Sequence, residues 1–245
     1  MVLAVVAAAV VASVSVDPGS VAARLDEAFA HRGEEGGLEK LEAATRDALK
    51  SAPDDYEVLW RAARSMFWAA DSNPTQDSKR KYGKEGWDLA ERAIGLNGDR
   101  PEAYYYAAIN IGAYGEGVGI WKALTGGLES KFLDRIDKAI HIDASTQMSG
   151  PLLAKARYYH QMPWPKRDLG RAEKLYKQAV ENNPENLRAW YYLAQTQLKA
   201  GNAKDANDSM KQVWQRGVSY DPAEGNRIKS WGKRTQDAIN EELND

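Results

Sequence analysis

The sequence has no cysteine, no excess of either charge and no apolar run long enough to span a bilayer. Its 245 residues contain 33 Lys and Arg against 35 Asp and Glu, which gives a formal net charge of −2. The missing cysteines exclude disulfides, thiolate metal ligands, cysteine nucleophiles and lipid-modified cysteines. The balanced charge provides no strong field to attract nucleic acid or an anionic membrane. We therefore expect no nucleic-acid partner and no transmembrane span.

Metal-ligating and catalytic patterns are also scarce. The three histidines, His31, His141 and His160, have no second histidine or cysteine at ligand spacing. Carboxylate pairs such as Asp54 and Asp55 lie in predicted turns or tails, where solvated charge is the ordinary explanation. Nothing in the pattern fixes an acid and a base in one pocket. The sequence thus predicts no metal, no cofactor and no enzymatic activity.

The longest apolar run is MVLAVVAAAVVASVSV, at residues 1–16. It is too short to cross a membrane and ends in small residues, as a secretory signal does. The usual basic start is missing, so a loosely packed N-terminal helix is the alternative. We expect a signal peptide or apolar N-terminal segment at 1–16 and a periplasmic or otherwise exported protein, with a cytoplasmic location as the alternative.

The sequence does contain a repeat. A helix-ending phrase occurs four times, each time followed by an aromatic-rich helix: ALKSAPDDYEVLW from Ala48, AIGLNGDRPEAYY from Ala93, AIHIDASTQMSGPLL from Ala139 and AVENNPENLRAWYY from Ala179. In the last unit, Trp190, Leu193, Ala194 and Gln197 fall on one stripe of a helix, and Gly201 supplies a turn. This is the tetratricopeptide repeat (TPR) pattern, in which stacked helical hairpins share a continuous core.

The pattern predicts one all-α domain over residues 17–245, built as a TPR-like solenoid of helical hairpins with about four repeats. The repeats are expected at about 54–96, 100–142, 149–182 and 185–217, preceded by a helical hairpin at 20–31 and 38–50. A polar helix over 222–243 is expected to cap the array, with Ile228, Trp231, Thr235 and Ile239 as its apolar stripe.

The internal units are longer than the usual TPR of roughly 34 residues. The alanines at positions 48, 93, 139 and 179 are 45, 46 and 40 residues apart. The extra residues lie between the two helices of each unit, at 71–81, 112–127 and 161–167, so all three insertions should project from one rim. In the second insertion, the glycines of 112–119 are expected to break the helix before a short amphipathic helix at 120–124.

A TPR array presents part of each first helix to its concave side. Each first helix has one large landmark residue, such as Trp190 in the last unit, and the positions one after, two before and five after it should face the concave side. We expect the residues on that side to include Trp60, Arg64, Phe67, Tyr105, Ile109, Ala154, Tyr158, Tyr191 and Gln195. This aromatic hollow is either a binding groove or the seat of the capping helix. Trp121 and Trp164, on the rim insertions, are further binding candidates, although we expect Trp164 to pack against the following helix because prolines flank it.

Two passages carry a family resemblance. They are YYYAAINIGAYGEGVGIWKAL at 104–124 and the stretch from Leu153 to Gly201, which contains MPWPKRD at 162–168 and then NPENLR. Both resemble the TPR T-component proteins associated with tripartite ATP-independent periplasmic (TRAP) transporters. The resemblance implies an exported, all-helical and often trimeric protein with an apolar pore, which docks the transporter's substrate-binding component. A eukaryotic family of microtubule-dynamics regulators is similar too, in its inserted repeats and an MPW segment.

Two functional interpretations follow. The first is a non-enzymatic binding scaffold of the T-component type, whose hollow takes an apolar small molecule or a segment of a protein partner and which can form a homotrimer. The second is a generic TPR adaptor for protein–protein interaction, which binds a peptide in an open groove and has no small ligand.

Overall fold

The computed structural model describes Asp17 and residues 19–244, and the regular elements in this part of the chain are helices. They are α1 (Val21–Ala30), α2 (Gly37–Ser51), α3 (Tyr56–Ser72), α4 (Gln76–Leu96), α5 (Pro101–Val118), α6 (Ile120–Thr125), α7 (Leu128–Asp143), α8 (Thr146–Gln161), α9 (Leu169–Asn182), α10 (Leu187–Lys199), α11 (Ala203–Gln215) and α12 (Pro222–Asn244). None of them is long and apolar enough to cross a bilayer. The apolar segment 1–16, where we expected a signal peptide, lies outside the described residues.

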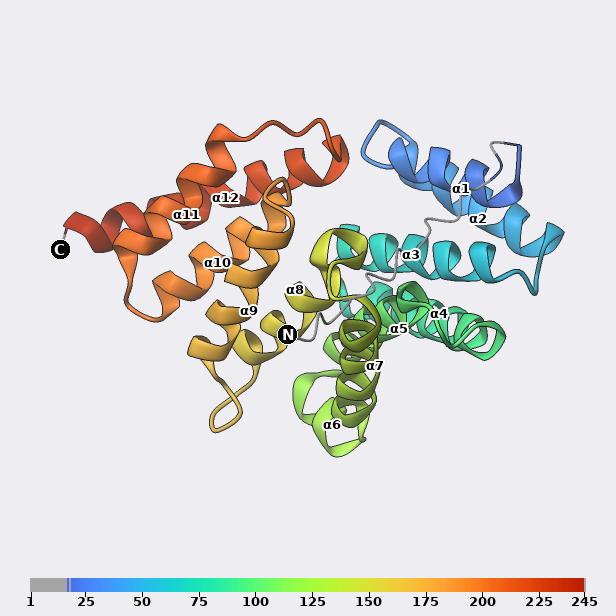
Figure 1. Cartoon of the computed structure of the whole chain (residues 1–245), viewed down its shortest axis with the longest axis horizontal. Coiled ribbons are helices and arrows are strands. Elements are labelled where there is room, and N and C mark those ends of the chain that lie inside the picture. The colour runs from blue at the N-terminus through green and yellow to red at the C-terminus, as the bar shows by residue number, and fades with distance from the viewer. Residues whose placement is uncertain (1–16, 18, 245) are drawn as a thin grey trace, which may run out of the picture.

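The helices stack as consecutive hairpins in a curved array (Figure 1). After the N-terminal pair of α1 and α2, the repeat units pair α3 with α4, α5 with α7, α8 with α9, and α10 with α11. Helix α12 packs on α10 and α11 and ends the array. The predicted fold class, an all-α TPR-like solenoid with insertions and a C-terminal capping helix, is confirmed.

Polar side chains fix where many of the helices begin. Ser20, Asp55, Thr75, Asp168 and Asn186 each accept a hydrogen bond from the backbone N–H three residues later, at the first turn of the helix that follows. Such a cap satisfies one of the amide groups that has no partner within the helix. The short polar phrases between the repeats therefore set the start of the next unit.

Small residues allow the helices to approach closely. Ala62, Ala63, Ala90, Ala93 and Ala107 are all fully buried where α3, α4 and α5 meet. Between α4 and α5 even a methyl group would be too large at some positions: a Cβ added to Gly83 would lie 2.6 Å from the backbone nitrogen of Tyr114. The second unit is thus held against the first by backbone contact as well as by side-chain packing.

The glycines of the second insertion do not break the helix where the sequence suggested. Helix α5 continues through Gly112, Gly115 and Gly117 and ends at Val118, and the chain turns at Gly119, where φ is +93°. The reason is packing, because a Cβ on Gly117 would lie 2.6 Å from the backbone nitrogen of Arg80 in α4. Gly117 thus allows close contact between α5 and α4, and the short helix α6 follows the turn.

The three insertions lie next to one another. Most of the first insertion forms the start of α4, where Lys79 forms a salt bridge with Glu116 at the end of α5. The second ends at α7, and there Glu129 forms a salt bridge with Lys166 in the loop between α8 and α9. These ion pairs join the insertions along one rim of the array.

One buried histidine makes the fold sensitive to pH. His160 is 8% exposed, and its Nδ1 lies 2.9 Å from Thr196 Oγ1. The Thr196 hydroxyl donates its hydrogen to the Tyr192 carbonyl at 2.8 Å, so Nδ1 of His160 is the donor in this pair. Burial, followed by the charges of Arg157, Lys199 and Arg167, lowers the pKa of His160 from 6.5 to about 3. The folded protein therefore holds a neutral imidazole.

Acidification should accordingly cost stability. Below pH 6.5 the unfolded chain protonates His160 and the folded chain does not, so stability is lost as the pH falls from 6.5 towards 3. Between pH 7 and 5 we expect wild type to lose about 1 kcal/mol more free energy of unfolding than His160→Gln, allowing for residual solvent screening. Urea unfolding at several pH values measures this difference. The exposed His141, replaced by Gln, should follow wild type; equal slopes for wild type and His160→Gln would contradict the prediction.

Candidate functional site

The concave side of the array contains a cavity of about 680 Å³. The first helix of every repeat unit contributes to its wall, namely α3, α5, α8 and α10. The end of α1 and parts of α6, α7 and α12 complete it. A volume of this size falls within the range of sites for small molecules or a few side chains, roughly 300–1,000 Å³.

Most of the binding candidates from the sequence line this cavity: Arg64, Phe67, Tyr105, Ile109, Tyr158, Tyr191 and Gln195, together with Ala154. Burial raises the pKa of Tyr105 and Tyr158, so their hydroxyls stay protonated. The Tyr158 hydroxyl donates to Glu129, and its ring stacks on Phe132 with the centroids 5.7 Å apart. That these residues bind a partner stays a prediction.

Trp60 does not reach the cavity. It is 4% exposed, stacks on Tyr106 with the ring centroids 5.8 Å apart, and donates from its indole nitrogen to Glu57 at 2.9 Å. The N-terminal hairpin covers this part of α3, since Asp26 of α1 forms salt bridges with Arg61 and Arg64. The sequence offset expects Trp60 to face the hollow, whereas its ring packs into the core that α3 shares with α4 and α5.

Trp121 and Trp164 lie outside the cavity as well. They are 69% and 85% exposed, so the expectation that Trp164 packs against the following helix is wrong. The loop between α8 and α9 is closed by its own hydrogen bonds: the amides of Lys166 and Arg167 donate to the Pro163 carbonyl at 3.0 and 3.2 Å. Because these bonds hold the turn, the Trp164 side chain is not needed to anchor it.

The capping helix closes one side of the hollow without filling it. Ile228, Thr235 and Ile239 of α12 are buried, while Trp231 is 37% exposed and lines the cavity together with Glu224. The sequence left open whether the hollow is a binding groove or the seat of this helix. The helix occupies an edge of the hollow, and the cavity remains beside it.

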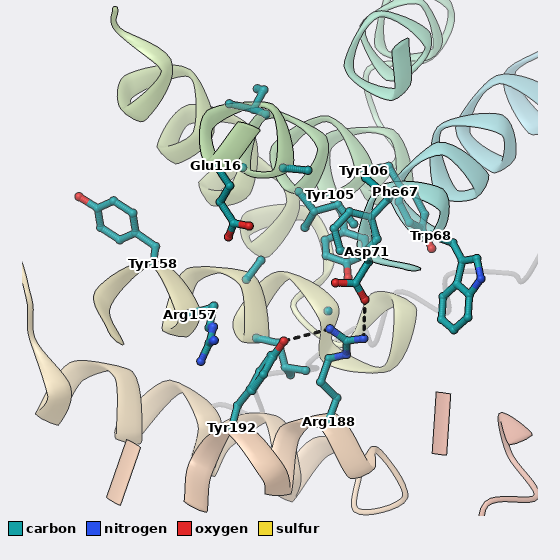
Figure 2. Close-up of a pocket in the computed structure, with 18 of the residues that line it drawn as sticks. Phe67, Trp68, Asp71, Tyr105, Tyr106, Glu116, Arg157, Tyr158, Arg188 and Tyr192 are labelled. Carbon is teal, nitrogen blue, oxygen red and sulfur yellow. Dashed lines mark hydrogen bonds and ion pairs between the residues drawn. The ribbon is translucent and has the colours of Figure 1, made fainter. Parts of the chain in front are cut away.

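An ion cluster joins the first unit to the last across the cavity. Asp71 at the end of α3 forms salt bridges with Arg188 of α10 at 3.0 Å and Arg227 of α12 at 2.8 Å. Arg188 also pairs with Glu224. It donates to the Tyr192 hydroxyl at 2.9 Å, and Figure 2 shows this bond together with the pair between Arg188 and Asp71. Burial works to raise the pKa of Asp71, but Arg188 and Arg227 outweigh it and hold this pKa below its usual value. We call Asp71, Arg188, Glu224 and Arg227 the closing cluster.

One residue of the closing cluster can be predicted from the repeat pattern. Arg188 lies two residues before the landmark Trp190, and this is one of the concave offsets, although the residues expected from that unit are only Tyr191 and Gln195. Asp71 lies in an insertion, for which the repeat offers no position. Arg64 is the only charged residue that we expect in the hollow, whereas the wall also carries charges of both signs from α3, α8 and α10.

A strained turn forms part of the wall. Gln147, Met148 and Ser149 have φ of +49°, +58° and +61°, which is uncommon for residues other than glycine and costs roughly 1–2 kcal/mol each. Hydrogen bonds hold all three: the Tyr106 hydroxyl donates to the Gln147 side chain at 2.7 Å, the Asn186 amide to the Met148 carbonyl at 2.7 Å and the Asn183 amide to the Ser149 hydroxyl at 2.6 Å. The turn is therefore fixed by residues from three units.

The wall of the cavity is more apolar than polar. Its aromatic and aliphatic wall offers contact area, and Asp71, Glu116 and Glu129 are engaged in ion pairs. Within Asp17 and residues 19–244, no three His, Asp, Glu or Cys side chains lie close enough together to hold a metal ion. The arrangement favours recognition of a ligand or a partner segment by shape and apolar contact.

Comparison with known families identifies the chain. Residues 23–172 match the family described as regulator of microtubule dynamics protein 1-3, and residues 166–222 match a tetratricopeptide repeat family. The first match covers more than half of the chain. The chain belongs to the family of regulators of microtubule dynamics 1-3. Its family match spans α1 to α8, so the cavity combines this region with Arg188, Tyr191 and Trp231 from the part beyond it.

The T-component resemblance is thereby overturned. The matching families are the microtubule-dynamics regulators and a TPR family, and no T-component family matches. The similarity to microtubule-dynamics regulators, which rested on the inserted repeats and the MPW segment, is the correct one. The inserted helical repeats are shared features that do not separate the two families. The transporter docking and the trimer, both inferred from the T-component resemblance, lose their basis.

More distant structural neighbours are other helical proteins. No curated protein sequence matches the chain. Two crystal structures of MamA align with it at 13% identity, with TM-scores of 0.43 and 0.46, covering 79% and 83% of this chain and 90% and 95% of theirs. Yeast Tom70 aligns at 12% identity with a TM-score of 0.34, over 91% of this chain and 66% of Tom70.

Proposed function

We propose that this member of the microtubule-dynamics regulator family is a non-enzymatic adaptor that holds a segment of a partner protein in its cavity. The observation that carries the proposal is the aromatic cavity itself, with Phe67, Tyr105, Tyr158 and Tyr191 on its wall. Aromatic residues that surround a concave site supply large contact areas at a small entropic cost. The match to a family of regulators of microtubule dynamics supports a partner among proteins of microtubule regulation.

The test is a pair of neighbouring substitutions on α8. Tyr158 lines the cavity and Tyr159 does not, although both are half-buried. Peptides selected from a displayed random-sequence library against the whole chain serve as probes. Tyr158→Ala should weaken their binding about 30-fold, the effect of losing an aromatic hot spot, while Tyr159→Ala leaves it within about threefold. Fluorescence anisotropy measures the affinities, and thermal unfolding checks that both variants fold.

Two results would count against this function. One is a library that gives no binder, and the other is equal affinity of both variants. An apolar small molecule is the second candidate occupant, favoured by the cavity volume of about 680 Å³. It would appear in native mass spectrometry as a mass bound to the purified chain that Tyr158→Ala releases and Tyr159→Ala retains.

A further inference from the structure

Three cations gather at the C-terminal end of α8, where the wall of the cavity meets the rim. Lys199 donates to the His160 carbonyl in the last turn of α8 at 3.3 Å, and Arg167 donates to the carbonyl of Met162, the residue that caps this helix, at 3.1 Å. With the Gln161 amide oxygen turned towards it, Arg157 donates to that oxygen from Nε and Nη2 at 3.0 and 3.2 Å. We call Arg157, Arg167 and Lys199 the basic cluster.

The positive charge of the basic cluster is not balanced. None of its members forms a salt bridge with a carboxylate anywhere in the described part of the chain, whereas most other arginines near the cavity do. Asp168, the next residue in the chain, is engaged as the N-cap of α9. The end of a helix supplies about half a negative charge, which cannot neutralise three cations. More than two positive charges therefore remain without a partner.

The neighbours of the basic cluster respond to this charge. The pKa of Lys199 is lowered, first by burial and then by the charges of Arg167 and Arg157. The low pKa of His160 has burial as its main cause and all three cations as further causes. Both shifts agree with a compact group of like charges.

The basic cluster connects the cavity with the outer surface. Arg157 is half-buried, lines the cavity, donates to Gln195 at 3.1 Å and lies 4.5 Å from the centre of the Tyr192 ring (Figure 2). Arg167 and Lys199 are exposed. A chain that leaves the cavity on this side therefore passes three cations whose hydrogen-bond partners in the fold are neutral.

We propose that the bound partner segment is acidic, and that its Asp or Glu side chains pair with the basic cluster while an adjoining apolar side chain enters the cavity. This rests on the adaptor function proposed above and adds the chemistry of the partner. A carboxylate fits the guanidinium groups of Arg157 and Arg167, which can each donate two parallel hydrogen bonds. Acidic side chains of the partner would also neutralise the unpaired positive charge of the basic cluster.

The experiment uses the displayed random-sequence library against the full chain at low ionic strength. A triple variant, Arg157→Gln with Arg167→Gln and Lys199→Gln, is compared with a control that loses the same charge elsewhere, Lys138→Gln with Lys174→Gln and Lys204→Gln. These control lysines are exposed and make no salt bridge within the described residues. Wild type and control should select peptides rich in Asp and Glu beside an aromatic or aliphatic residue. The triple variant should bind these peptides about tenfold more weakly, and added salt should weaken wild type more than the triple variant.

The outcomes separate the two proposals. Binders without acidic enrichment, or binders that the triple variant holds as tightly as the control does, would overturn the acidic partner and leave the adaptor function standing. A library without binders would overturn both. If wild type selects no acidic peptide but binds vesicles of anionic phospholipid through the basic cluster, the cluster serves a membrane surface and the proposal is wrong.

Discussion

Replacing Arg188 with methionine should lower the free energy of unfolding by about 3 kcal/mol. This arginine lies at the centre of the closing cluster, and only 15% of its side chain is exposed. Its loss leaves Glu224, 13% exposed, without its cation, and Asp71 with Arg227 alone. Removing one partner from a buried ion pair costs about 3–5 kcal/mol because the other charge stays buried, and we take the lower limit since the cluster is partly solvated. Chemical denaturation measures the change.

Arg92 provides the matched control. It pairs with Asp54, but the two side chains are 49% and 79% exposed, so Arg92→Met should cost less than about 1 kcal/mol. Similar losses for the two variants would show that the closing cluster adds nothing beyond a surface ion pair.

The closing cluster also bears on how the array unfolds. In an open solenoid each repeat contacts only its neighbours, so the ends can unfold independently. Here Asp71 and Arg188 join the first and last units, and Arg32 near the end of α1 forms a salt bridge with Asp221 before α12 at 2.6 Å. These contacts couple the ends of the chain, so wild type should unfold in one transition. Arg188→Met should broaden or split that transition, which distinguishes loss of coupling from uniform destabilisation.

The sequence was sufficient for the frame of this fold because the frame is periodic. Leu59, Ala62, Ala63 and Met66 repeat with helical spacing, and all four are buried between α3 and its neighbours. The aromatic wall of the cavity follows from the same periodicity, since Tyr105 of α5 and Tyr191 of α10 occupy equivalent positions in their units.

Features that depend on contacts between distant units were not predictable in this way. Trp60 is buried because its ring stacks on Tyr106 of α5 and is covered by Arg61, which Asp26 of α1 holds in place. Asp71 gains its importance from Arg188 and Arg227, more than a hundred residues away. The glycines of α5 favour a helix break by themselves, because sequence alone does not show that α4 lies against Gly117. In each case a tertiary contact outweighs a local tendency.

Gly83 tests that conclusion most directly. A Cβ at this position would lie 2.6 Å from the backbone nitrogen of Tyr114 and 3.0 Å from the carbonyl oxygen of Asn110. Backbone atoms cannot rotate away as a side chain can, so α4 and α5 must move apart. The movement would also weaken the hydrogen bond that the fully buried Asn110 side chain donates to the Ala63 carbonyl, which is 3.0 Å long in this structure. We expect Gly83→Ala to destabilise the protein by about 3 kcal/mol, the upper end of overpacking costs.

The same substitution at Gly95 should have the opposite sign. Gly95 is exposed in the last turn of α4, and a Cβ there would meet nothing within 4 Å. Alanine restricts the unfolded chain and suits a helix better than glycine does, so Gly95→Ala should gain up to about 1 kcal/mol. Urea unfolding of the two variants isolates the contact, because residue type and helix are the same. If Gly83→Ala is also stabilising, then α4 and α5 are not in backbone contact, and their glycines are no more than weak points in the helices.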